Sequence, residues 1–84
     1  MAGVSAWRVN DVVAYDATRD AATTLTALLL QVARRDASQY GSAGVEIAHL
    51  RRDVVAVDGY DRAAVAELAR HIAIRVAELS GEPS

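Results

Sequence analysis

The chain has 84 residues, a formal net charge of −2, no cysteine, 52% hydrophobic residues and 24% charged residues. Disulfide scaffolds and thiolate metal sites need cysteine and are excluded. A membrane span needs about 20 consecutive apolar residues, whereas the longest strongly apolar run is Leu28–Leu30. The slightly acidic balance argues against nucleic acid as the main partner. We therefore expect one small domain over residues 1–84, cytoplasmic and without a cofactor.

Helical spacing of apolar residues dominates the first half of the chain. We expect a lead-in over residues 1–10, followed by a first helix over about 11–38. Asn10 or Asp11 can cap this helix, because a short polar side chain accepts hydrogen bonds from free backbone N–H groups. The apolar stripe of the helix consists of Ala22, Leu25, Leu29 and Val32.

The segment from Gly41 to Gly44 breaks the first helix. Gly41 suits the left-handed position that follows a helix, and Ser42 can cap the next one. We expect this second helix over about 43–57. Its apolar residues recur at steps of three and four, and they are Ile47, Leu50, Val54 and Val57.

A second break at 58–61 precedes the clearest amphipathic pattern. Asp61 is a suitable N-cap for a third helix over about 61–79. Gly81 ends this helix and leaves residues 80–84 as a tail. The apolar stripe consists of Val65, Leu68, Ile72, Val76 and Leu79. The three patterns together predict an all-α fold, a three-helix bundle.

An internal similarity supports an alternative, a small α/β fold with a duplicated strand–helix unit. Residues 11–22 and 53–64 share seven of twelve identities, and each segment opens with a β-branched run that a buried strand would also use. Such a unit would suit a small ligand-binding or catalytic domain. The helical stripe through 47–57 favours the all-α interpretation, because two strands alone make a poor sheet. Whether 53–58 is helix or strand stays open.

The polar residues that could carry chemistry are better explained as surface groups. His71 and Glu67 share a helix face, as a metal-binding pair would, but a solvated pair has the same spacing. The doublets Arg34–Arg35 and Arg51–Arg52 are each followed by an aspartate, so their charge is compensated locally, unlike that of a nucleic-acid site. We expect no catalytic residue, no metal site and no enzymatic activity.

Two apolar features fit contact with another protein. Ile74 lies off the stripe of the third helix among charged neighbours. The N-terminal end of the longer first helix overhangs, and its apolar side chains need cover from a partner or a second copy. The candidate contact residues are Trp7, Val12, Val13, Tyr15, Arg19, Arg70, Ile74 and Arg75.

The segment 50–61, with Val65 and Leu68 after it, resembles the helix–Asp turn–helix of small bacterial antitoxins that neutralise zeta-type kinase toxins. The end Arg75–Leu79 and the opening Ala17–Ala22 of the long helix are similar to the same family. The resemblance implies a non-catalytic helical bundle, in which one helix caps the toxin and blocks its nucleotide site. We therefore predict a protein-binding module, the antitoxin of a toxin–antitoxin pair. The alternative is a self-associating helical homodimer with a structural role.

Overall fold

The structure is a computed structural model that describes the backbone of residues 2–81 and the side chains of residues 12–81. Its elements in chain order are α1 (Ala2–Arg35), the short 3₁₀ helix η1 (Ala37–Gln39), α2 (Tyr40–Ala56) and α3 (Arg62–Ser80). No strand occurs in residues 2–81. The predicted three-helix, all-α fold is confirmed, and the α/β alternative is not supported. Residues 53–56 form the last turn of α2.

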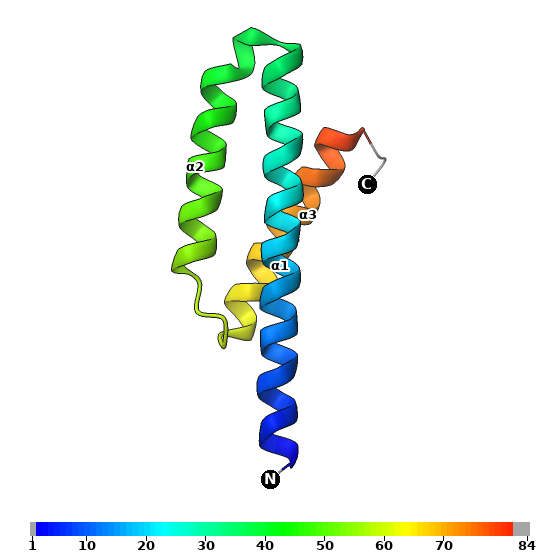
Figure 1. The fold of residues 1–84 in the computed structure, drawn as a ribbon, viewed down its shortest axis with the longest axis vertical. Coiled ribbons are helices and arrows are strands. Elements are labelled where there is room, and N and C mark those ends of the chain that lie inside the picture. Colours follow the sequence, from blue (N-terminus) through cyan, green and yellow to red (C-terminus); the bar gives the residue numbers. More distant parts are fainter. Residues whose placement is uncertain (1, 82–84) are drawn as a thin grey trace.

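The other two helices pack on α1. Helix α2 runs antiparallel beside α1, and α3 crosses α1 obliquely (Figure 1). Both have their main contacts with α1 and few with each other. The molecule measures 54 × 27 × 16 Å. Its longest dimension is that of α1, because 34 residues at 1.5 Å per residue span about 51 Å.

The core is thin and follows the predicted stripes. Leu29 of α1 and Ile72 of α3 are its most buried large side chains, each 1% exposed. The buried apolar residues are Ala22, Leu25, Leu29, Ala43, Leu50, Val65 and Ile72. Other stripe positions, such as Ile47 and Leu68, are half-buried at the edge of this cluster. The apolar periodicity therefore identified the faces that meet.

Helix α1 begins at Ala2, so the expected lead-in over 1–10 and the predicted start at residue 11 are wrong. Asn10 and Asp11 have helical backbone instead of ending a helix. A cap forms only where the backbone leaves the helical conformation. No proline stands in this segment to force that change, so each further residue extends a helix that is already nucleated.

Helix α1 ends at Arg35, earlier than the predicted residue 38, because Asp36 has extended backbone with φ −140° and ψ 103°. The Asp36 carboxylate accepts hydrogen bonds from the hydroxyl of Ser38 at 2.6 Å and from its backbone N–H at 3.0 Å. These bonds stabilise the charged form and lower the pKa of Asp36.

The predicted left-handed Gly41 is wrong, since Gly41 lies inside α2. Gly81, with φ 71°, is the residue with positive φ in the described chain.

Of the two N-caps that the sequence predicts for α2 and α3, one forms in the structure. Helix α2 begins at Tyr40, before the predicted residue 43, and Ser42 does not cap it: its hydroxyl donates to the carbonyl of Gln39 at 3.1 Å. Helix α3 begins after Asp61, whose carboxylate accepts from the backbone N–H of Ala64 at 3.1 Å. The predicted Asp61 cap is therefore confirmed.

Tyr15 fixes the connection between α2 and α3 against α1. Its hydroxyl donates to the carbonyl of Val54 at 3.1 Å, one of the last α2 carbonyls, which have no partner within the helix. Its ring lies against Gly59, where an added Cβ would stand 3.3 Å from the Tyr15 Cγ atom. A side chain at position 59 would therefore push the loop away from α1. This contact sets where α3 starts.

Candidate functional site

A groove separates α2 from α3, and α1 forms its floor. One part of it, about 390 Å³, is lined by Leu25, Glu46, His49, Leu50, Asp53, Leu68, His71, Ile72, Ile74, Arg75 and Glu78. An adjoining hollow of about 430 Å³ shares three of these residues and is lined by Asp53, Ala56, Val57, Ala64, Glu67, Leu68 and His71. We call the two together the α2–α3 groove. It exists because both bordering helices pack on α1 instead of on each other.

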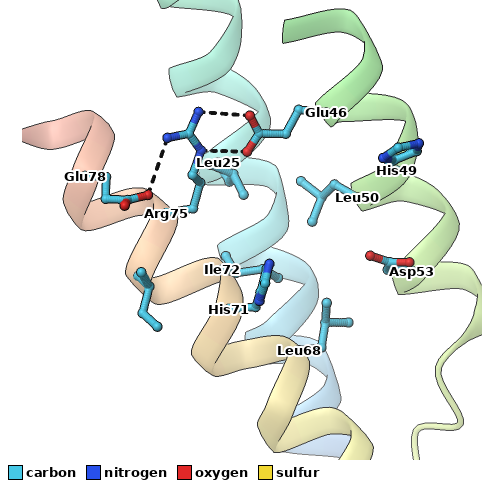
Figure 2. Close-up of a pocket in the computed structure, with 11 residues that line it drawn as sticks. Leu25, Glu46, His49, Leu50, Asp53, Leu68, His71, Ile72, Arg75 and Glu78 are labelled. Atoms are coloured by element: carbon cyan, nitrogen blue, oxygen red, sulfur yellow. Dashed lines mark hydrogen bonds and ion pairs between the residues drawn. The ribbon is translucent and has the colours of Figure 1, made fainter. Parts of the chain in front are cut away.

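Figure 2 shows an apolar interior with polar groups along both edges. Leu25 of α1, Leu50 of α2 and Ile72 of α3 are buried at the base of the groove, and Leu68 is half-buried beside them. These side chains belong to the core cluster, so the groove opens directly onto the core. A partner side chain placed here would therefore bury apolar surface on both molecules.

An ion pair links the two walls at one end of the groove. The Arg75 guanidinium donates from Nε to Glu46 Oε2 at 2.7 Å and from Nη2 to Glu46 Oε1 at 2.9 Å. Glu78 accepts from Arg75 Nη1 at 3.4 Å. These interactions, first the hydrogen bonds to Glu46, raise the pKa of Arg75, so its charge is secure. The bidentate pair joins α2 to α3 over a sequence separation of 29 residues.

The remaining polar groups of the groove are exposed. His49 and Asp53 project from α2 toward the open space, and His71 projects from α3 (Figure 2). No cation pairs with Asp53 among the described side chains, residues 12–81. Counted over the lining, four carboxylates stand against one guanidinium, so the groove has a formal charge of −3 with both histidines neutral.

The structure divides the predicted contact residues among several places. Ile74 and Arg75 line the α2–α3 groove, and Ile74 is 53% exposed. Arg70 lies outside the groove and pairs with Glu67 at 2.6 Å on the surface of α3. Two of the predicted contact residues, both in α3, therefore line the α2–α3 groove.

The predicted residues on α1 lie away from this groove. Val12 and Val13 are 44% and 61% exposed. Tyr15 is half-buried in the loop contact described above, and the Arg19 guanidinium lies 6.0 Å from the centre of its ring. Trp7 lies outside the residues whose side chains are described. Tyr15 therefore serves an internal contact, whereas Val12 and Val13 remain open surface.

Sequence reasoning missed the α2 wall of the groove. Glu46, His49 and Asp53 are not among the contact residues that the sequence predicts. Each lies beside the apolar stripe of α2, where a charged flank is ordinary. Their common feature is that they face α3, and no local pattern reports this. The one available signal was that Glu46, His49 and Asp53 recur at steps of three and four.

A second groove lies between α1 and α3 and has a different character. It is about 570 Å³ and is lined mainly by small side chains, namely Ala14, Ala17, Thr18, Ala21, Gly59, Arg62, Val65, Ala66 and Ala69. Its lining has few large side chains, and Arg62 is its one charged residue, so it offers little chemistry to select one partner over another. The α2–α3 groove, with its large apolar base and charged edges, is the stronger candidate.

The whole molecule exposes more surface than its mass requires. Its accessible area is 6087 Å², whereas a compact monomer of 8.9 kDa exposes about 4,800 Å². The large apolar side chains that contribute are Val12, Val13, Leu30, Tyr40, Val45, Val55, Tyr60 and Ile74. The excess exceeds the roughly 800 Å² that each partner contributes to a standard interface.

Three further observations bear on function. No helix among the described residues is both long and apolar enough to cross a bilayer. Groups of three or more metal-ligating side chains do not occur in that part of the chain either. Comparison with protein-family models, with curated proteins and with solved structures finds no match. A functional proposal therefore rests on the geometry and on the chemistry of the surface.

Proposed function

We propose that this protein is a non-enzymatic module that binds another protein and acts by steric occlusion. The observation that carries the proposal is the α2–α3 groove, an apolar trench that opens onto the core and has charged edges. Helix-in-groove binding uses this combination of an apolar base and polar flanks. The excess of exposed surface supports the same conclusion, because a partner would cover it.

The arrangement of titratable groups supports binding over catalysis. General acid–base catalysis relies on side chains whose pKa values are shifted by a dry, enclosed environment. His49, Asp53 and His71 instead lie exposed at the edges of the groove. Arg75 and Glu46, the most enclosed charges of the groove, pair with each other, and Glu78 also accepts from Arg75. Such groups are suited to orienting a partner.

The specific form that we propose is an antitoxin that neutralises a kinase toxin. The resemblance of the segment 50–61 and its surroundings to such antitoxins supports it, as does the small all-α fold. In this role the protein would cover the nucleotide site of the toxin. A cytoplasmic location is part of the proposal, because that is where a kinase toxin finds its nucleotide.

Co-expression with the toxin tests this role. The proposal requires a kinase gene beside the gene of this protein; that kinase is induced alone and together with the protein, and growth is followed. We expect growth to stop with the kinase alone and to resume when both are made. In a phosphoryl-transfer assay, a molar excess of the purified protein should suppress the kinase. Full kinase activity in the presence of that excess would overturn the antitoxin assignment.

A self-associating homodimer is the second candidate, and Val12 and Val13 favour it. Both lie exposed on α1, near the end that extends beyond the other helices in Figure 1. A symmetric pair of such ends could cover them. Light scattering on the purified protein decides this point. A mass of twice 8.9 kDa, reduced to the monomer by Val13→Asp, would favour the homodimer, whereas a monomeric wild-type mass would remove it.

A further inference from the structure

We propose that the α2–α3 groove binds a cationic amphipathic helix, one that presents an apolar ridge between rows of lysine or arginine. This inference deepens the proposed function by naming the chemistry of the partner, and it rests on that function, because a groove for a helix presupposes a partner. The inference is supported by the length of the groove and by the placement and the sign of the charges that line it.

The dimensions of the groove suit a short helix. Along α2 it extends from Glu46 to Val57, which is three helical turns or about 16 Å. Helices α2 and α3 both pack on α1 and form the two walls of the groove. A helix seated between them would contact Leu25, Leu50 and Leu68 with its apolar ridge. It would complete a four-helix arrangement in which each helix has neighbours on two sides.

The charges of the groove select the sign of the partner. Its lining has a formal charge of −3, and its one cation, Arg75, is already paired with Glu46 and Glu78. Glu67 is paired with Arg70, which lies just outside the lining. Among the described residues, the lining carboxylate left open to a cationic helix is therefore that of Asp53. A second copy of this chain is disfavoured, because symmetric groove-to-groove contact would place two negative surfaces face to face.

Asp53 has no structural reason to be acidic. It lies in the last turn of α2, where the helix dipole favours a cation and disfavours a carboxylate. No described side chain compensates its charge. A partner cation would do so. Asp53→Lys is therefore expected to fold normally, and it reverses the charge at the centre of the groove.

A designed peptide tests the groove without knowledge of the natural partner. The probe is a capped, fluorescein-labelled peptide of about four helical turns, with leucine at helical spacing and lysine at the flanking positions. The matched control peptide carries glutamate in place of each lysine. Fluorescence anisotropy measures binding to the purified full chain at low salt and at 0.5 M salt. We expect the lysine peptide to bind, the glutamate peptide to fail, and added salt to weaken the complex.

Two variants of equal net charge make the test specific to the groove. Asp53→Lys changes the groove, and Asp16→Lys makes the same charge change at an exposed position of α1 that lines neither part of it. We expect Asp53→Lys to weaken binding of the lysine peptide at least tenfold and Asp16→Lys to change it less than threefold. Equal loss in both variants would mean that the peptide responds only to net charge, and it would overturn the proposal.

Other outcomes also separate the alternatives. Equal affinity for the lysine and glutamate peptides, or no binding of either, would overturn the inference. A wild-type dimer that Asp53→Lys dissociates would assign the groove to a second copy and overturn it as well. The peptide test does not use the toxin. A negative peptide result therefore does not bear on suppression of the kinase, which is measured separately. Failure of the kinase assay likewise leaves peptide binding intact.

Discussion

Tyr15 illustrates how one residue connects sequence, fold and function in this protein. The sequence predicts it as part of an apolar contact surface, together with Val12 and Val13. In the structure its ring lies against Gly59 and its hydroxyl bonds to the carbonyl of Val54. The residue type is informative because tyrosine joins an apolar body to a hydrogen-bonding end. Whether that end meets a partner or the same chain is decided by the last turn of α2, 39 residues away in sequence.

The Tyr15 hydroxyl is expected to stabilise the fold measurably. Tyr15→Phe removes the hydrogen bond to Val54 and leaves one of the terminal α2 carbonyls to solvent. We expect the free energy of unfolding to fall by about 0.5–1.5 kcal/mol, the usual net value of such a bond. Urea denaturation followed by circular dichroism measures it.

Tyr40→Phe is the matched control, because Tyr40 is 74% exposed and its hydroxyl is solvated. The urea midpoint of Tyr40→Phe should equal that of the wild-type protein. Equal midpoints for the two variants would show that the bond from Tyr15 to Val54 does not form in solution.

At the scale of the elements, the positions of the stripes were predictable and the helix ends were less so. Leu25, Leu29 and Ile72 lie on the stripes and are buried, because apolar periodicity reports directly which face of a helix avoids water. Helix ends depend on competing local bonds. Asp36 ends α1 through its bonds to Ser38, whereas Gly41, a stronger terminator by residue type, lies within α2. Residue preferences of this size are easily outweighed by packing.

Leu29 and Leu30 provide a matched test of the α1 stripe. They are adjacent in sequence, but Leu29 is 1% exposed and Leu30 is 46% exposed. Leu29→Ala should destabilise the protein by about 2–5 kcal/mol, since it leaves a cavity where the three helices meet. Leu30→Ala should change the free energy of unfolding by about 0.5 kcal/mol or less. Thermal melts of both variants suffice. Equal losses would mean that α1 is rotated relative to the structure described here.

At the scale of the whole molecule, the relation between α2 and α3 determines the candidate site. The sequence predicts three amphipathic helices, but it does not state which pairs of stripes meet. Both the α2 and the α3 stripe pack on α1, so Asp53 faces α3 across open space, whereas Glu46 is joined to α3 by its ion pair with Arg75. A closed bundle made from the same helices would bury that space and have no groove. The function proposed here therefore depends on a property that periodicity alone does not encode.

Small-angle X-ray scattering tests whether α1 keeps its full length in solution, on which the packing of both other helices depends. The Cα radius of gyration is 14.9 Å, whereas a compact domain of 84 residues has about 12 Å. The difference arises mainly from the length of α1, which spans most of the 54 Å long axis. We expect a solution value close to 15 Å for the monomer, with the mass of 8.9 kDa checked by light scattering on the same sample. Addition of the lysine peptide should fill the groove and leave the radius nearly unchanged, because the peptide lies within the existing outline. A radius near 12 Å for the free monomer would mean that α1 is not one straight helix over Ala2–Arg35, and the arrangement in which both other helices pack along it would then not exist in solution.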